Sequence, residues 1–325
     1  MGGFDPGDGP TATTLAASDD GAVVRWPPIS FDRKIAAATA VPFAFFLAVR
    51  LLGGLPVWLA ALTLFLGAPH VLATVGLYVD RDIRSIAAAD PVRYVVVPLA
   101  AIPVSVVLFG VAHGAVAVLS VTAFLAWQTQ HYTKQNVGMF AFWCRARGLV
   151  AMSERERSLV RATTAVGILG ILRAMALAPG WDRALQVGGL TLVALGALVV
   201  TASWKGQRSV ALLAALAFYL PLHLFKVDLL GAAFAYQAAH GAQYYLMVGQ
   251  VIRRNPVAVR VTIPVVLLGG VVPLAALRAS AFATAPVLFG FAKGVAAAHF
   301  LADASLWRLR RPEIRRVMAT RFPFL

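Results

Sequence analysis

Residues 94–112 read YVVVPLAAIPVSVVLFGVA, a run without a single charged side chain. A helix needs about 20 predominantly apolar residues to cross the hydrocarbon core of a bilayer. Comparable runs recur through the whole chain, whose 325 residues are 60% hydrophobic and only 13% charged. A soluble domain carries roughly twice that charged fraction. The sequence therefore predicts an all-α, polytopic membrane helix bundle.

The apolar runs predict about ten transmembrane helices, separated by short polar connections. The expected spans are 35–53, 56–79, 94–112, 114–133, 159–177, 184–202, 209–225, 228–251, 258–277 and 280–302. Two of the connections, at 113–114 and at Lys226 to Asp228, are very short. Either of them could instead belong to a broken or re-entrant segment, so that a bundle of eight spans remains an alternative.

The basic residues support the larger number of spans. With the N-terminus inside, 23 of the 29 Lys and Arg residues fall in the inner segments, and four fall in the outer ones: Arg50, Arg183, Lys226 and Arg278. Positively charged loops remain on the cytoplasmic side of a membrane. We therefore expect both termini in the cytoplasm and the protein in the inner (cytoplasmic) membrane. The same distribution explains the net charge of +15 without a nucleic-acid partner.

Little of the chain lies outside the predicted spans. Residues 1–30 lack the basic-then-apolar order of a signal peptide and predict a flexible cytoplasmic tail. Residues 31–307 are expected to form one transmembrane domain. Residues 308–325 form a basic cytoplasmic segment that we expect against the anionic headgroups of the lipid bilayer. The single cysteine, Cys144, excludes an intrachain disulfide framework and a cysteine-cluster zinc site.

Four of the six histidines lie on four different expected spans: His70, His131, His240 and His299. In the predicted topology they share a depth near the cytoplasmic face; His70, for example, precedes Asp80 by ten residues, or about 15 Å of helix. Ionisable groups within a membrane normally face the bundle interior, and imidazole is a common ligand for transition metals. We therefore predict that these four histidines bind a metal. Each of them alone could instead be a hydrogen-bonding group between helices.

Polar residues share helix faces with these histidines, because positions i, i+3 and i+4 lie side by side. Gln135, Gln237 and Asp303 are so placed and are expected to support the bound cofactor, since a metal-bound imidazole usually gives its other N–H to such an acceptor.

Three tyrosines and one lysine are further candidates for the catalytic machinery. Tyr132, Tyr236 and Tyr244 are expected to shape the pocket or to donate hydrogen bonds to bound oxygen. Lys293 lies well inside the last span. It could pair with a carboxylate, neutralise the headgroup of an anionic substrate, or form a Schiff base.

Several of these features together resemble one family of membrane enzymes. They are the GAPH segment at 67–70, His131 some sixty residues later, His240 in a later polar helix, and the HF-x-x-D segment at 299–303. These short patches are similar to the Brp/Blh family, multispanning membrane oxygenases that cleave β-carotene to retinal. One departure is Tyr244, which stands one turn after His240 where that family has a second histidine.

The resemblance implies a non-haem iron ion and an elongated apolar substrate that enters from the bilayer. It would make His70, His131 and His240 iron ligands, with His299 as the fourth. Electrons, where the reaction needs them, would come from a donor partner or from the substrate, since the sequence shows no nucleotide-binding motif.

Three classes of function remain open from the sequence. The first is a metal-dependent oxidoreductase, an oxygenase acting on a lipid- or carotenoid-like substrate; the sequence lacks HExxH and clustered histidine boxes, so a mononuclear site fits it best. The second is an electron-transfer protein with haem b, or another transition metal, held by two of the histidines. The third is a transporter whose histidine and glutamine side chains line a polar cavity. Retinal bound through Lys293 is a more remote possibility.

Overall fold

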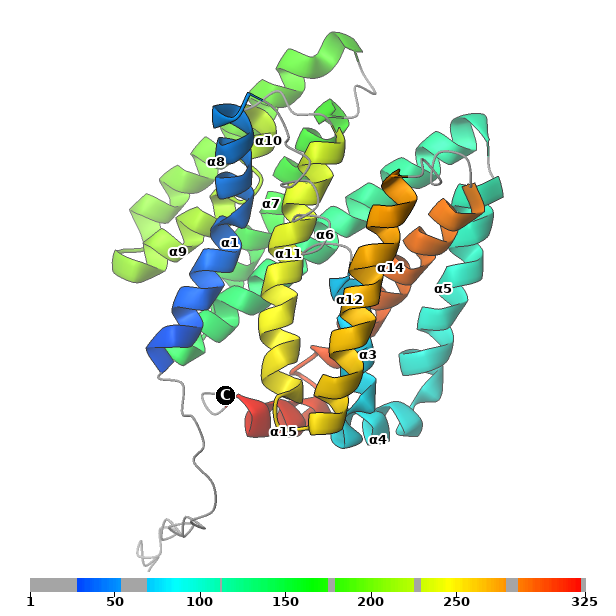
Figure 1. Ribbon diagram of the computed structural model, residues 1–325. Helices are drawn as coiled ribbons and strands as arrows, with labels where there is room; N and C mark the ends of the chain where they lie inside the picture. Colours follow the sequence, from blue (N-terminus) through cyan, green and yellow to red (C-terminus); the bar gives the residue numbers. More distant parts are fainter. Residues whose placement is uncertain are drawn as a thin grey trace, which may run out of the picture.

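The computed structural model describes residues 28–53, 69–111, 113–174, 179–224, 229–278 and 286–322. These residues form helices joined by short turns, and no strand occurs among them (Figure 1). The helices of the first half are α1 (Pro28–Leu51), α3 (His70–Val79), α4 (Arg81–Ala89), η1 (Val92–Val96), α5 (Val97–Ser105), η2 (Val106–Val111) and α6 (Gly114–Ala146). Those of the second half are α7 (Glu154–Ala174), η3 (Pro179–Trp181), α8 (Asp182–Ser203), α9 (Gly206–Ala217), α10 (Pro221–Leu224), α11 (Leu229–Ile252), α12 (Pro256–Arg278), α14 (Pro286–Leu306) and α15 (Pro312–Arg321).

The predicted all-α class is confirmed for the described residues. Three helical segments are long and apolar enough to cross a membrane: Val92–Val111, Asp182–Ser203 and Pro286–Leu306. Two shorter helices, His70–Val79 and Pro256–Gly269, are also apolar. These segments fit a membrane protein.

Two expected spans do not correspond to one helix of the same length. The span expected at 114–133 is part of α6, which continues to Ala146. It continues because no proline interrupts it and because its polar residues find partners on neighbouring helices, as described below. The span expected at 209–225 is divided into α9 and α10. The second of these begins at Pro221, which has no N–H with which to continue the preceding helix.

Of the two predicted terminal segments, the structure describes mainly the C-terminal one. The expected tail at 1–30 lies almost wholly outside the described residues, and α1 begins at Pro28. The basic C-terminal segment contains α15. Ile314 and Met318 of this helix, and Phe322 directly after it, are buried in the same core as residues of α3, α4 and α11. Arg321 joins this segment to α4 through ion pairs with Asp80 (3.1 Å) and Asp82 (3.0 Å).

A close approach of backbones positions α14, the helix that carries His299. A Cβ atom at Gly290 would come within 2.8 Å of the Cα atom of Val106, and one at Gly294 within 2.7 Å of the Cα atom of Ile102. Glycines four residues apart allow two helices to pack backbone to backbone, as they do in membrane helix pairs. This contact holds α14 against α5 and η2.

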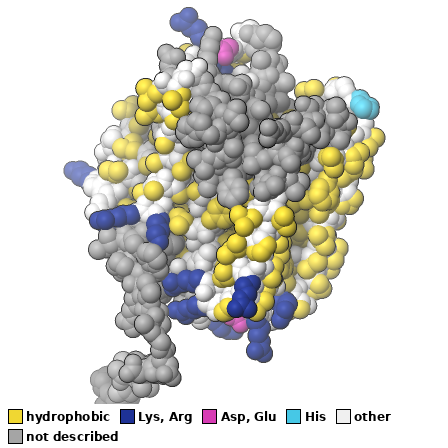
Figure 2. All heavy atoms as spheres, in the orientation of Figure 1, with side chains coloured by type: hydrophobic (Ala, Val, Ile, Leu, Met, Phe, Trp, Pro, Cys, Tyr) yellow, Lys and Arg dark blue, Asp and Glu magenta, His cyan; other side chains and the backbone are white. Residues whose placement is uncertain are grey.

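The surface has an apolar flank and a basic end. Figure 2 shows hydrophobic side chains covering much of the visible flank, whereas Lys and Arg side chains gather toward the lower end, where α4 and α15 lie in Figure 1. On segment 92–111 the following side chains are more than half exposed: Val92, Val96, Leu99, Val104, Val107 and Val111. A continuous apolar face of this kind is expected where a helix contacts lipid.

The connection between α6 and α7 is held by one buried carboxylate. Glu156 is fully buried and accepts hydrogen bonds from Nε and Nη2 of Arg208, the latter at 2.7 Å, and from the backbone N–H (2.7 Å) and hydroxyl (2.9 Å) of Ser153. Arg208 also donates to the carbonyls of Val150 (3.0 Å) and Ala151 (3.2 Å). Burial alone would raise the pKa of Glu156, but the hydrogen bonds from Arg208 and Ser153 hold this pKa below its ordinary value of 4.5.

We expect Glu156→Gln to lower the free energy of unfolding by about 2 kcal/mol at pH 7, because it removes a charge that accepts several hydrogen bonds. A depressed pKa stabilises the folded state above the pKa of the unfolded chain, and this stabilisation is lost as the pH falls through the folded-state pKa. The difference between wild type and variant should therefore shrink below about pH 4.5.

Thermal unfolding of the purified protein between pH 7 and pH 3 measures this effect. Glu154→Gln is the matched control, since Glu154 is exposed and pairs only at the surface with Arg157 and Arg161. The control should change stability by less than about 1 kcal/mol. Equal destabilisation by both substitutions at pH 7 would contradict the special role of the buried carboxylate.

Candidate metal centre

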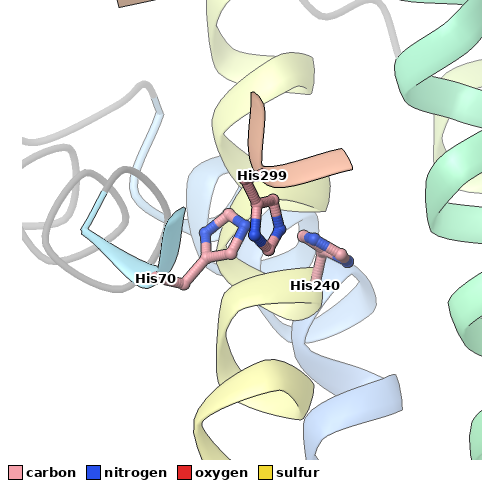
Figure 3. A group of neighbouring side chains, drawn as sticks. All are labelled: His70, His240 and His299. Atoms are coloured by element: carbon pink, nitrogen blue, oxygen red, sulfur yellow. The ribbon is translucent and has the colours of Figure 1, made fainter. Parts of the chain in front are cut away.

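The structure brings together the four histidines singled out in the sequence, which we call the histidine cluster. His70 is the first residue of α3, directly after Pro69, while His131 lies in α6, His240 in α11 and His299 in α14. Their exposed fractions are 1%, 9%, 1% and 2%. Figure 3 shows three of them converging from separate helices.

The rings of the histidine cluster are in direct contact with one another. The ring of His70 lies 4.5 Å from that of His240 and 5.0 Å from that of His299, measured between centroids. His131 lies 4.8 Å from His240 and 5.4 Å from His299. The Nε2 atoms of His131 and His240 are 3.2 Å apart, so that one of them donates a hydrogen bond to the other when both rings are neutral.

The potential ligand atoms form two groups that share His299. One consists of His70, His240 and His299; the other consists of His131, His299 and Asp303. Within each group the ligand atoms lie within 4.8 Å of one another. An ion bound at about 2.1 Å from each nitrogen can hold two ligand atoms at most about 4.2 Å apart. Either group therefore needs inward shifts of less than about 1 Å to hold an ion.

A hydrogen-bonded chain of polar side chains fixes the Asp303 side of the cluster. The Tyr244 hydroxyl donates to Oδ1 of Asp303 at 2.9 Å and lies 2.8 Å from the Thr74 hydroxyl. The Thr74 hydroxyl is in turn 2.8 Å from Nδ1 of His299. Oδ2 of Asp303 is 3.5 Å from Nε2 of His299 and 3.8 Å from Nε2 of His131. This carboxylate is thus placed either to bind an ion itself or to orient the imidazoles that do so.

A second chain of polar side chains, made mainly of amides, begins at the backbone of His240. Nε2 of Gln135 donates to the backbone carbonyl of His240 (3.0 Å) and to Oε1 of Gln243 (2.8 Å). Nε2 of Gln243 donates to Oγ1 of Thr39 (3.1 Å) and to Oδ1 of Asn136 (3.1 Å). Gln135 therefore supports the helix that carries His240 rather than its imidazole ring.

Aromatic side chains enclose the cluster. The ring of Phe300 stacks on that of His131 at 4.2 Å, and Trp127 meets Phe300 edge-on at 5.3 Å. Tyr132 lies 4.4 Å from the ring of His240, and its hydroxyl accepts a hydrogen bond from Gln128. These rings exclude water from the imidazoles, which strengthens the electrostatic interactions among them.

The structure does not bring three other candidates to the histidine cluster. Tyr236 packs on Phe218 (5.4 Å) and Tyr219 (5.3 Å). Gln237 is half-buried and forms no hydrogen bond with any of the four clustered histidines. The Lys293 ammonium lies 5.1 Å from the ring centroids of both Phe124 and Phe289, and no described carboxylate forms an ion pair with it. A cation above aromatic faces is stabilised without a counter-charge.

The remaining two histidines have separate environments. His113 is exposed and directly precedes α6. His223 is fully buried in α10, and its Nε2 lies 2.9 Å from the carbonyl oxygen of Val166. Its ring also fills the space beside Gly189, where any added Cβ atom would collide with it. His223 thus connects α10 to α7 and α8.

Three polar residues of the site were not among the sequence-based candidates: Thr74, Asn136 and Gln243. Thr74 lies four residues after His70 on an otherwise apolar helix, and this spacing was a usable signal. Gln243 likewise lies three residues after His240. Asn136 follows the polar segment that carries His131, but nothing in the sequence indicates that its partner comes from α11.

Comparison with known proteins assigns no family. No protein-family model, no curated protein and no solved structure matches the chain. The candidate metal centre therefore rests on its own side chains and on the helices that hold them.

Proposed function

We propose that this protein is a membrane-embedded, metal-dependent oxidoreductase, an oxygenase with non-haem iron that acts on an apolar, lipid- or carotenoid-like substrate. The observation that carries the proposal is the meeting of four buried imidazoles and one carboxylate from four helices. A transition-metal ion is the ligand that best satisfies so many nitrogen and oxygen donors in one buried place. The resemblance of the short segments around these residues to the Brp/Blh family supports the same proposal, and a distant relationship to that family is part of it.

The iron would be held by His70, His240 and His299, with His131 and Asp303 completing the donor set. One group combines nitrogen and oxygen donors. His131, His299 and Asp303 have the composition of the two-histidine, one-carboxylate set used by non-haem iron oxygenases. Two buried atoms support a ligand at this place, because Nδ1 of His240 and Nε2 of His299 form no hydrogen bond among the described residues. Iron(II) bound there supplies open coordination positions at which dioxygen can be activated.

The side chains around the donor set have separate roles. Tyr244 and Thr74 hold Asp303 and His299 in place, and the Tyr244 hydroxyl donates a hydrogen bond to the carboxylate. Gln135 sets the position of α11 and hence of His240. Tyr132 shields the His240 ring from water.

The substrate would approach along the aromatic side of the cluster. Phe300 stacks on His131, and Trp127, which is half-buried, continues from Phe300 toward the surface. An apolar molecule dissolved in the bilayer is the substrate that such a lining accepts. A separate electron-donor partner is proposed for a reaction in which the substrate does not supply the electrons.

A haem would fit this cluster less well than a bare ion. Two axial histidines must lie on opposite faces of a porphyrin, and the four rings here are packed with adjacent centroids between 4.5 and 5.9 Å apart. The surrounding aromatic residues and the carboxylate of Asp303 take up the remaining space.

We further propose the full topology of about ten transmembrane helices, with both termini in the cytoplasm of a cell whose inner membrane holds the protein. Each of the ten expected runs contains helix within its described residues. The loop-by-loop distribution of Lys and Arg sets the orientation. In this arrangement the basic end formed by α4 and α15 faces the cytoplasmic headgroups.

The metal content of the purified protein tests the proposed function. We expect about one iron per chain by elemental analysis, without the sharp Soret absorption of haem, and at least a tenfold loss of iron in His240→Ala, since ligand removal typically weakens a site by this much or more. His113→Ala is the matched control and should retain the iron, because His113 is exposed and outside the cluster.

Folded wild-type protein without stoichiometric metal would contradict the proposed iron site. Full iron retention in His240→Ala would contradict it as well. A Soret band would show that the protein binds haem instead of non-haem iron. His299→Gln, which keeps a polar side chain of similar size, should lose iron in the same way and separates ligand loss from misfolding.

Cysteine accessibility tests the topology. In a Cys144→Ala background, a membrane-impermeant maleimide should label Asp182→Cys in intact cells, because that residue lies in an outer connection. Arg310→Cys should react only after the cells are opened, because the C-terminal segment is cytoplasmic. Labelling of both positions from the same side of the membrane would contradict the odd number of crossings, five, that is expected between residues 182 and 310.

A further inference from the structure

The hydrogen bonds that join Asp303 to His299 have a direction, and this direction is set at the carboxylate. The Tyr244 hydroxyl donates to Oδ1 of Asp303 at 2.9 Å. A hydroxyl carries a single hydrogen, so in the 2.8 Å contact between Thr74 and Tyr244 the hydrogen comes from Thr74. The Thr74 hydrogen is then used as well. The 2.8 Å contact between Thr74 and Nδ1 of His299 therefore requires a hydrogen on Nδ1.

This direction selects one tautomer of His299. A neutral imidazole carries one ring hydrogen, so that a ring protonated on Nδ1 has only a lone pair on Nε2. His299 is 2% exposed, and its Nε2 atom has no hydrogen-bond partner among the described residues. The nitrogen that the chain of hydrogen bonds leaves free is thus a nitrogen that can bind a metal ion.

The two ends of the chain face each other. Asp303 lies four residues after His299 on α14, so both side chains project from one face of the helix. Oδ2 of Asp303 is 3.5 Å from Nε2 of His299. In the ionised carboxylate neither atom carries a hydrogen, and two buried acceptors that face each other are unfavourable without a cation. An ion about 2.1 Å from both atoms would subtend an angle of about 110°, so this pair needs no inward shift.

Further donors lie within reach of the same position. Nε2 of His131 is 3.8 Å from Oδ2 of Asp303. The ring of His299 lies 5.0 Å from that of His70 and 5.9 Å from that of His240, and Figure 3 shows the three rings together. An ion held by His299 and Asp303 would therefore meet other imidazoles of the histidine cluster.

We propose that Thr74 and Tyr244 are positioning residues that hold His299 in the Nδ1–H tautomer, and that they thereby make Nε2 of His299 and Oδ2 of Asp303 ligand atoms of the metal centre. Both hydroxyls act through these two residues and not as ligands. An ion bound by the two ligand atoms closes a ring that runs through Thr74 and Tyr244. The assignment of ligand atoms rests on the proposed function, whereas the tautomer does not depend on a metal.

Nitrogen NMR of the full-length protein tests the tautomer directly. The protein is labelled with isotopic nitrogen in histidine, freed of metal with a chelator, and studied in phosphatidylcholine nanodiscs at about pH 8, above the ordinary pKa of histidine. The signals of His299 are those that are missing from His299→Gln. Protonated and unprotonated ring nitrogens have well-separated resonances. We expect a protonated Nδ1 and an unprotonated Nε2.

Breaking the chain at either hydroxyl should move the hydrogen to Nε2. In Thr74→Val the Nδ1–H group loses its acceptor. In Tyr244→Phe the Thr74 hydroxyl loses its acceptor and is free to donate to Nδ1 instead. We expect each substitution to change the ratio of the two tautomers by about tenfold in favour of Nε2–H, the factor that corresponds to one hydrogen bond.

Two further variants serve as controls. Thr74→Ser keeps the hydroxyl and should keep the wild-type ratio of tautomers. Tyr245→Phe removes a hydroxyl from the next position of α11 and should also leave the ratio unchanged, because the Tyr245 hydroxyl is buried and has no hydrogen-bond partner among the described residues.

The affinity for Zn²⁺, measured by competition with a chelating dye, gives a second readout. Thr74→Val and Tyr244→Phe should each weaken zinc binding about tenfold, as the loss of a group that orients a ligand typically does. The double variant should bind zinc about as well as either single variant, because the two hydroxyls act in series. Losses that multiply to about a hundredfold would show that the two residues act separately and would overturn the proposal.

A wild-type His299 protonated on Nε2 would overturn the proposal, and so would a tautomer ratio that neither substitution changes. The wild-type measurement keeps the test decisive even if a variant does not fold. It is made without metal and is therefore independent of the iron content. Protein that lacks iron but shows the expected tautomers in wild type and variants would contradict the proposed function while supporting the role of Thr74 and Tyr244.

Discussion

The structure depends on one constraint: inside a bundle of apolar helices, a buried polar group is stable only with a partner in the protein. The four clustered histidines meet this constraint partly through one another and through a few neighbours, while Nδ1 of His240 and Nε2 of His299 have no hydrogen-bond partner among the described residues. Thr74 of α3 bonds to His299 of α14, and Gln135 of α6 bonds to the backbone of α11. The same contacts that could hold a metal thus also fix how four helices lie against one another.

The polar contacts divide into two branches that leave the cluster in different directions. One branch passes through Tyr244 to the carboxylate of Asp303 and supplies the oxygen donor of the proposed iron site. The other passes from the backbone of His240 through Gln135 and Gln243 and ends at the side chains of Thr39 and Asn136. The amide branch thereby fixes the position of the α11 backbone beside His240.

Hydrophobicity and spacing were sufficient for the helical class and for much of the site. Apolar runs located the helices, and an equal depth for His70, His131, His240 and His299 followed from counting residues to the nearest charged loop. The side of a helix on which a residue lies was a weaker guide. Gln237 shares a face with His240 in sequence terms yet forms no hydrogen bond with the clustered histidines, whereas Thr74 does so from an apolar helix. Which helices are neighbours depends on close backbone contacts such as that of Gly294 with Ile102, and no single helix reveals these.

X-ray absorption spectroscopy at the edge of the bound metal shows whether the four histidines hold one ion, because it reports the atoms around the ion in the intact protein. We predict a first shell of nitrogen and oxygen atoms at about 2.0–2.2 Å, with the multiple-scattering pattern of at least three imidazoles. A shell without imidazole, or the pattern of a porphyrin, would show that the four histidines do not meet at a common ion.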